Sequence, residues 1–205
     1  MLTAVILAAG SARRMGSLKQ LLPWQGEKTI LETVVETVLA CPEIDDEVRV
    51  VLGAGRQEVA PVLQAIKDPR LIIVDNPQHQ HGMLSSIQIG VANLPVTSEG
   101  FALFLGDQPL LSSVLVTNLA RQWRQDGNDF LVPVCQGRRG HPVFVHKKYL
   151  PEILALEDCD GGLRNLLRLH SDLVTFRQVD SPAIYIDLDY PHEYKKYRPK
   201  GDWSK

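Results

Sequence analysis

The sequence predicts an α/β fold, a Rossmann-like three-layer sandwich with a mostly parallel central sheet. Short apolar runs rich in β-branched residues recur along the chain, and segments with helical spacing lie between them. The first run, residues 4–9, is continuously apolar and stops at Gly10. This pattern is typical of a strand buried on both faces. Strands that alternate with helices indicate βαβ units, and therefore a largely parallel sheet.

The other elements follow the same alternation over most of the chain. We expect helices over residues 29–40, 57–66, 83–94 and 112–125, and strands over 48–52, 71–74 and 101–105. The last third is less regular, with strands expected at 130–134, 142–145, 174–179 and 184–188 and a helix at 161–170. Because no repeat or linker interrupts the pattern, we predict one domain over residues 1–198 and a loose tail over 199–205.

Composition excludes several classes of protein. The 205 residues are 44% hydrophobic and 22% charged, with a net charge of −2, which is ordinary for a globular chain and argues against non-specific nucleic-acid binding. Cys41, Cys135 and Cys159 are far apart and form no CxxC pair, as expected for thiols in a reducing compartment. No segment approaches the ~18 apolar residues of a membrane span, and the apolar N-terminus lacks the charged start of a signal peptide. We therefore expect a cytoplasmic protein with no membrane or nucleic-acid partner.

Three segments leave expected strand ends with unusual chemistry, and they begin at Gly10, Asp75 and Gly106. Ligands of open α/β sheets bind at the carboxyl ends of the strands, near the point where the strand order reverses. All three segments can therefore meet in one crevice. This crevice is where we expect the functional residues.

The first of these segments carries small and basic residues, in the stretch LAAGSARRMGSLK over residues 7–19. Small residues let a ligand approach the backbone, whose N–H groups can cradle phosphate oxygens, and Arg14 and Lys19 supply positive charge. The spacing is neither a Walker A loop nor GxGxxG, because Gly10 and Gly16 are one residue too far apart and Ser17 replaces the required lysine. A simple turn with solvated arginines is the alternative, but the basic residues favour a phosphate ligand.

Carboxylates follow two other expected strands. Asp107 comes directly after the strand at 101–105, where a carboxylate can hold a divalent metal ion over phosphates or simply stabilise a turn. Asp187 and Asp189 lie two residues apart at the end of the expected strand 184–188, so both would point to one face and could complete a magnesium site. Either pattern alone also fits a structural role.

Histidines and possible nucleophiles give less information. His79 and His81 are close in sequence, but no third metal ligand is in register, which favours a polar loop. His141 lies in a Gly/Pro turn, a position from which a side chain can touch a substrate. No Ser–His–Asp arrangement and no activated cysteine is recognisable, so covalent catalysis is not expected.

The combination of motifs resembles a known family. LAAGSARRMGSLKQLLPWQG resembles the signature of nucleotidyltransferases with the nucleotide-diphospho-sugar transferase fold, and LGDQPLL resembles their metal-binding aspartate motif. Within this family, the molybdenum cofactor cytidylyltransferases are the most similar branch, on the stretches DNPQHQHGMLSSIQIG, GRRGHPVF, DGGLRNLL and YIDLDYPHEY. The resemblance runs from about residue 2 to residue 194. It implies CTP and molybdopterin cofactor as substrates, Mg²⁺ as cofactor, and a client molybdoenzyme or its insertion chaperone as a further partner.

The resemblance also implies residue roles. A terminal phosphate of the pterin substrate would attack the α-phosphorus of CTP, so no protein nucleophile is required. Arg14, Lys19 and Asp107 would be catalytic, and Asp107 and Asp189 would bind the metal. The nucleotide would contact Leu7, Ala8, Ala9, Gly10, Arg14, Lys19, Gly82, Ser85 and Ser86, and the pterin would face Arg139, Gly140, His141 and Asp187. One departure is that Tyr-Pro-His-Glu stands at residues 190–193, where the family often has Thr-Pro-Glu-Asp.

Other functions remain open on the sequence. The same fold serves guanylyl transfer to molybdopterin and transfer to sugar or alcohol phosphates, and a non-catalytic cofactor-insertion chaperone is an alternative of another class. Ala9 favours CTP over GTP, because its methyl group narrows the space beside the base, although one methyl gives only ~1–3 kcal/mol of selectivity. A dinucleotide-dependent oxidoreductase is disfavoured, because no GxGxxG follows the first strand and Gly53 stands where an acidic residue should end the second.

Overall fold

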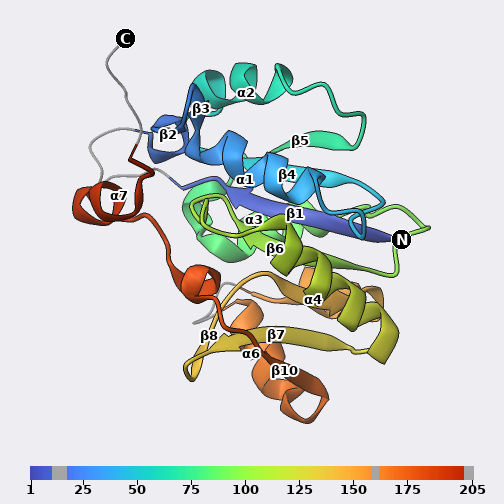
Figure 1. Cartoon of the computed structure of the whole chain (residues 1–205). Coiled ribbons are helices and arrows are strands. Elements are labelled where there is room, and N and C mark those ends of the chain that lie inside the picture. The colour runs from blue at the N-terminus through green and yellow to red at the C-terminus, as the bar shows by residue number, and fades with distance from the viewer. Residues whose placement is uncertain (11–17, 158–161, 201–205) are drawn as a thin grey trace.

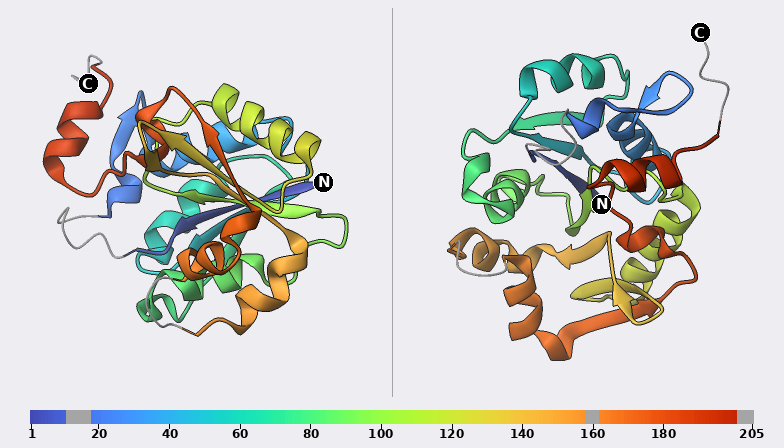
Figure 2. Two further views of the ribbon diagram at one scale, coloured as in Figure 1. Left: turned by 90° about the horizontal axis from the view of Figure 1, so that it is seen from below. Right: turned by 90° about the vertical axis from the view of Figure 1, so that its left-hand side faces the viewer.

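The computed structural model describes residues 1–10, 18–157 and 162–200. In these residues one eight-stranded sheet forms the centre of the molecule (Figure 1). Helices cover both faces, as the left view of Figure 2 shows for α4 on one side and α3 and α6 on the other. The predicted three-layer α/β class is confirmed.

The strand order of the sheet is β10-β7-β9-β6-β1-β4-β5, with β8 paired to β7. β1 runs parallel to both β4 and β6, β4 to β5, and β7 to β10, whereas β9 runs antiparallel to its neighbours β6 and β7. The chain leaves β1 toward β4 and β5 and then returns to β6 on the other side, so the strand order reverses beside β1. The strands are β1 (Leu2–Ala8), β4 (Val48–Leu52), β5 (Leu71–Asp75), β6 (Gly100–Leu105), β7 (Phe130–Cys135), β8 (Arg138–Arg139), β9 (Val143–His146) and β10 (Val174–Gln178).

The two helical layers follow from alternation along the strands. Successive side chains of a strand point to opposite faces. In β1, Ala4 and Ile6 accordingly pack with helices α1, α2 and α4, whereas Val5 packs with α3, α5 and α6. The helices are α1 (Ile30–Leu39), α2 (Arg56–Gln64), α3 (Met83–Val91), α4 (Ser113–Asp126), α5 (Leu150–Ala155), α6 (Leu163–Leu169) and α7 (Pro191–Tyr197). Because the apolar positions follow these periods, most predicted elements lie within a few residues of those observed.

A small third cluster holds the end of the chain against its beginning. Trp24, in the short hairpin of β2 (Pro23–Gln25) and β3 (Lys28–Thr29), is buried with Ile30 and Leu188. Helix α7 lies beside this hairpin (Figure 1) and packs on it. The Tyr194 hydroxyl donates a hydrogen bond to the Pro23 carbonyl. This packing brings the segment that carries Asp187 and Asp189 next to Lys19.

The predicted strand over residues 184–188 is wrong. A 3₁₀ turn, η5 (Pro182–Tyr185), occupies the start of this segment, and residues 186–189 join no ladder. The reason is that the Ile184 carbonyl accepts hydrogen bonds from the His141 backbone N–H (2.7 Å) and from Gln108 Nε2 (3.2 Å). These hydrogen bonds occupy the Ile184 carbonyl, so the segment does not pair with a strand of the sheet.

Three further predictions concern the cysteines, membrane spans and the C-terminal tail. Cys41 and Cys135 are free and buried, and Cys159 lies outside the described residues. None of the described helices has the length and apolar character needed to span a bilayer. Helix α7 ends at Tyr197, and residues 201–205 of the expected tail lie outside the described residues.

Candidate functional site

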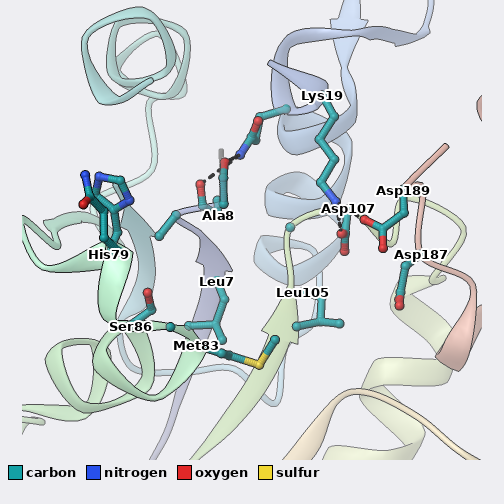
Figure 3. A pocket seen from close by; sticks show the side chains of 16 residues that line it. Leu7, Ala8, Lys19, His79, Met83, Ser86, Leu105, Asp107, Asp187 and Asp189 are labelled. Atoms are coloured by element: carbon teal, nitrogen blue, oxygen red, sulfur yellow. Dashed lines mark hydrogen bonds and ion pairs between the residues drawn. The ribbon is translucent and has the colours of Figure 1, made fainter. Parts of the chain in front are cut away.

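A cavity of about 780 Å³ opens at the carboxyl ends of β1 and β6, beside the reversal of strand order (Figure 3). Of the residues that sequence analysis assigned to the nucleotide and the metal, Arg14 lies outside the described residues, and Ser85 is not part of the wall. All other residues predicted to bind the nucleotide or the metal line this cavity, together with several residues that were not predicted. The lining is Leu7, Ala8, Ala9, Gly10, Lys19, Gln20, His79, Gln80, Gly82, Met83, Ser86, Leu105, Gly106, Asp107, Asp187 and Asp189.

Lys19 forms the electrostatic centre of the cavity. Its Nζ donates to Asp107 Oδ2 at 2.5 Å and to Asp189 Oδ1 at 2.7 Å. The Lys19 and Asp107 side chains are only 13% and 17% exposed, whereas Asp189 is 41% exposed. Burial opposes the ammonium charge, but the two carboxylates outweigh it, and the pKa of Lys19 is raised above its usual value. One ammonium group therefore bridges two carboxylates from distant parts of the chain.

Two buried glutamines hold the loops around this cluster. Gln20 Nε2 donates to the carbonyls of Ala8 and Gly10, each at 3.0 Å, and so ties the residue next to Lys19 to the end of β1. Gln108 Nε2 donates to Asp187 Oδ1 at 2.7 Å. Each glutamine is adjacent in sequence to a charged residue of the cluster, so its amide fixes the backbone from which that residue projects.

The backbone of Asp189 is held from its C-terminal side. Glu193 Oε2 accepts hydrogen bonds from the N–H groups of Asp189 (2.9 Å) and Tyr190 (3.0 Å) at the start of α7. From the other side, the Leu188 N–H donates to the Asp107 carbonyl at 3.1 Å. Glu193 belongs to the stretch that departs from the family pattern, and here it caps the helix next to Asp189.

The acidic side of the cavity suits a divalent cation. Asp107 Oδ1 is buried and has no hydrogen-bond partner among the described residues. Burial and the neighbouring charges of Asp107 and Asp189 raise the pKa of the Asp187 carboxyl, which shows how closely the three carboxylates converge. No three His, Cys, Asp or Glu side chains in the described ranges form a complete metal site. A magnesium ion held by one or two carboxylates commonly takes its other ligands from substrate phosphates and water.

His79 and Ser86 lie on the opposite side of the cavity from Asp107 and Asp189 (Figure 3). His79 lies against Gly53, where an added Cβ would be 2.5 Å from His79 Cβ and 3.0 Å from Ala9 Cβ. Only glycine at position 53 therefore lets His79 reach the wall beside Ala9. Gly82, with a φ of 94°, adopts a left-handed conformation that favours glycine and begins α3 at the cavity edge.

The two serines of α3 differ in their surroundings. Asn76 Nδ2 donates to Ser86 Oγ at 2.9 Å, and the buried Ser86 lines the cavity. Ser85 Oγ accepts from the same amide at 3.0 Å and donates to the Gly82 carbonyl at 2.9 Å. Ser85 thus stabilises the turn at Gly82, and Ser86 is the serine at the cavity wall.

A second cavity, of about 940 Å³, adjoins the first. Met83, Leu105 and Asp187 line both cavities and lie between them. The residues that sequence analysis assigned to the acceptor, Arg139, Gly140, His141 and Asp187, all line this second cavity. Its other walls are mostly apolar, so the two cavities form a polar chamber and a more apolar chamber side by side.

Sequence reasoning missed several residues of these cavities. Gln20, which lines the first cavity, and Gln108, which binds Asp187, adjoin Lys19 and Asp107 in the sequence, and this proximity was a usable signal. His79 lines the first cavity although the sequence offers it no metal partners, so a search for metal ligands gives no signal for it. Arg164 and Arg168 of α6 line the second cavity, and their spacing of four residues on one helix was the signal available.

The fold and the site together define the class of protein. The sheet and its helices match solved structures of the nucleotide-diphospho-sugar transferase type, including a CMP-KDO synthetase in complex with CTP at a TM-score of 0.74 and 16% identity. The family described as MobA-like NTP transferase domain matches residues 4–175. The chain belongs to this family of nucleotidyltransferases.

The relatives bear several different names. The molybdenum cofactor cytidylyltransferase of Escherichia coli is 26% identical over 93% of this chain and 92% of its own length. The nicotine blue oxidoreductase of Paenarthrobacter nicotinovorans is 33% identical over 91% of each chain. A solved homologue of Rv0371c from Mycobacterium sp. strain JC1 is 30% identical, with a TM-score of 0.77 over 95% of this chain and 93% of its own. Molybdenum cofactor guanylyltransferases match as well, so these similarities leave the choice of base open.

Proposed function

We propose that the protein is a Mg²⁺-dependent nucleotidyltransferase that transfers CMP from CTP to the terminal phosphate of molybdopterin cofactor and releases pyrophosphate. The observation that carries this proposal is the cluster of Lys19, Asp107 and Asp189 in a cavity beside the strand-order reversal. A cation together with two carboxylates is the set of groups that binding a metal–triphosphate requires. A neighbour with a TM-score of 0.74 was crystallised in complex with manganese, which supports a divalent metal in this fold.

The first cavity would hold the nucleotide. The end of β1 with the two residues that follow it (Leu7, Ala8, Ala9 and Gly10) and the start of α3 at Gly82 and Ser86 line a space large enough for a nucleoside triphosphate. Ser85 would act indirectly, through the turn at Gly82. Lys19 and Arg14 would contact the triphosphate, and Mg²⁺ on Asp107 and Asp189 would neutralise charge on the phosphates.

The second cavity would hold the acceptor, with Arg139, Gly140, His141 and Asp187 in its wall. Because the two cavities meet at Asp187, an acceptor phosphate would lie next to the α-phosphate of the nucleotide. An anionic oxygen of this phosphate forms the new bond to the α-phosphorus, and the bond from that phosphorus to the bridging oxygen breaks as pyrophosphate leaves. The protein's part is to position both substrates and to offset their charge.

The proposed preference for CTP over GTP rests on Ala9, in the wall of the first cavity. Ala9 is buried, and its methyl group lies close to Gly53 at the wall near His79. A side chain here leaves less room for a purine than for a pyrimidine, with a selectivity of about 1–3 kcal/mol. Relatives with cytidylyl and with guanylyl names match at similar identity, so the base has to be decided by measurement.

A dinucleotide-dependent oxidoreductase is the second candidate, because a relative at 33% identity bears an oxidoreductase name. Gly53, which follows β4, stands where such proteins usually place an acidic residue for the ribose. The carboxylate pair around Lys19 also has no evident task in hydride transfer. These two features favour nucleotidyl transfer.

One experiment separates the candidates. The purified protein is incubated with molybdopterin cofactor, Mg²⁺ and each of the four nucleoside triphosphates in turn, and pyrophosphate is measured. Release of pyrophosphate with CTP, at a higher kcat/KM than with GTP, is expected. A GTP preference would overturn the base assignment alone, whereas reduced-dinucleotide oxidation without pyrophosphate release from any triphosphate would replace the proposal by the oxidoreductase function. Binding to a client molybdoenzyme or its insertion chaperone stays a separate prediction.

A further inference from the structure

Among the described lining residues, the two adjoining cavities differ in charge. Asp107 and Asp189 line the first cavity, with Lys19 between them. The second cavity is lined by three arginines, Arg139, Arg164 and Arg168, and Asp187 is the one carboxylate among its described lining residues. In a protein with a net charge of −2, this concentration of guanidinium groups around one apolar cavity requires an explanation.

Two of these arginines come from one face of α6. Arg164 and Arg168 are one helical turn apart, and Leu163 and Leu166 anchor the same helix in the core on the α3 side of the sheet. Neither arginine makes an ion pair or hydrogen bond with a described residue. The third, Arg139, lies over the ring of Phe176 at 4.4 Å, and Phe176 also lines the cavity. All three arginines are exposed and line the cavity, so their guanidinium groups are available to a ligand.

His141 adds a neutral polar group to the same wall. Its backbone N–H is bound to the Ile184 carbonyl at 2.7 Å, whereas its imidazole makes no hydrogen bond to any described residue. Burial, together with the nearby charge of Arg164, lowers the pKa of His141 to about 4. At neutral pH the ring is therefore uncharged and offers one hydrogen-bond donor and one acceptor.

The reacting phosphate does not account for these arginines. It must approach the α-phosphate of the nucleotide, and the groups that would bind that nucleotide, Lys19 and Asp107, line the first cavity only. The arginines of α6 line the second cavity only. They therefore lie where the body of the acceptor would be, beyond the residues that both cavities share.

We propose that Arg164 and Arg168 bind a second anionic group of the acceptor, on a flat ring system whose polar edge meets His141. This inference rests on the proposed function for the position of the reacting phosphate. Guanidinium groups stack on planar rings and form paired hydrogen bonds to anions, and the apolar walls suit the ring faces. To the acceptor of the proposed function this inference adds one requirement, a negative charge away from the transferred group, and a sugar or alcohol phosphate without such a charge would bind poorly.

Direct binding tests the inference without nucleotide or turnover. The probes are pterin-6-carboxylate, which is anionic, and 6-methylpterin, which has the same ring without the charge, and their own fluorescence reports binding. We expect the wild type to bind the carboxylate at least ~10-fold more tightly than the methyl compound, as one charge-assisted hydrogen bond allows. Arg164→Gln and Arg168→Gln should each remove most of this preference, and Arg164→Lys should restore part of it.

The matched control is Arg121→Gln, which removes an arginine of α4 that pairs with Glu43 (3.2 Å) and does not line either cavity. It should leave the preference unchanged. Equal binding of the two probes by the wild type, no binding of the carboxylate, or an unaltered preference in both α6 variants would overturn the inference.

The same variants separate this inference from the proposed function. If pyrophosphate is released with a pterin acceptor but Arg164→Gln leaves the acceptor KM unchanged, the function stands and the inference is wrong. If the arginine-dependent preference for the anionic probe is found but no triphosphate yields pyrophosphate, the anion site stands and the proposed function is wrong.

Discussion

Replacing Lys19 by methionine should increase the affinity of the nucleotide-free protein for Mn²⁺, although the same change should lower turnover. The ammonium group occupies the space between Asp107 and Asp189, with contacts of 2.5 and 2.7 Å, so a divalent ion can reach both carboxylates only by displacing it. A charge-assisted hydrogen bond such as the one to Asp107 contributes about 1.5–3 kcal/mol. The pair with Asp189 is discounted to about 0.2–1 kcal/mol, because Asp189 is 41% exposed.

Together the two contacts oppose metal binding by about 2–4 kcal/mol, and each 1.4 kcal/mol corresponds to about tenfold in affinity. The displaced ammonium regains water, so we expect an increase of at least about tenfold in Lys19→Met. In the wild type, the triphosphate would offer Lys19 new partners, and the metal would therefore bind together with the nucleotide.

Electron paramagnetic resonance of free Mn²⁺ measures this affinity directly. Lys28→Met is the matched control, since it removes a lysine that pairs with Glu36 at 2.5 Å on the surface of α1. Asp107→Asn in the Lys19→Met background should abolish the gain. Unchanged or weaker Mn²⁺ binding by Lys19→Met would refute the view that this lysine occupies the metal position.

Four other outcomes are expected. Asp107→Ala should fold normally but lose nearly all pyrophosphate release, and near-normal magnesium-dependent turnover in the folded variant would contradict its assignment to the metal. Gly53→Ala should raise the KM for CTP more than it lowers kcat, because the added methyl would lie 2.5 Å from His79 Cβ and displace that wall; a pure loss of kcat would argue against this reading. Ala9→Gly should raise kcat/KM for GTP modestly, by no more than about 100-fold, without abolishing CTP use, and an unchanged CTP/GTP ratio would show that this methyl does not select the base. The pKa of His141 falls from 6.5 to about 4 on folding. Its contribution to the free energy of unfolding is therefore fully present above pH 6.5 and is lost as the pH falls toward 4, and this loss is about 3 kcal/mol at most. Urea unfolding measures the free energy of unfolding at pH 7 and at pH 4.5, and its decrease between these pH values should be smaller in His141→Gln than in the wild type. An equal decrease in both proteins would count against a buried neutral imidazole.

The sequence determined the order and type of most elements, because these depend on local patterns. The apolar run after Leu2 forms a strand in any context that buries both faces, and Thr29 with Glu32 forms the capping box that starts α1. The loops after β1 and β6 were also predictable sites, since carboxyl ends of parallel strands lie at one edge. The motifs in these loops resembled the nucleotidyltransferases, and the family match over residues 4–175 confirms that assignment.

Only the tertiary structure decided which of these groups meet. Lys19 lies 88 residues from Asp107 and 170 residues from Asp189 in the chain, and no local pattern fixes whether its ammonium faces solvent or two carboxylates. The segment at residues 184–188 has the composition of a strand, yet its Ile184 carbonyl bonds to His141 and Gln108, so long-range partners overrode the local preference. Arg164 likewise resembles any solvated helix residue until α6 packs beside His141. Short-range patterns set the elements, whereas the charge of each cavity arises from side chains that only packing brings together.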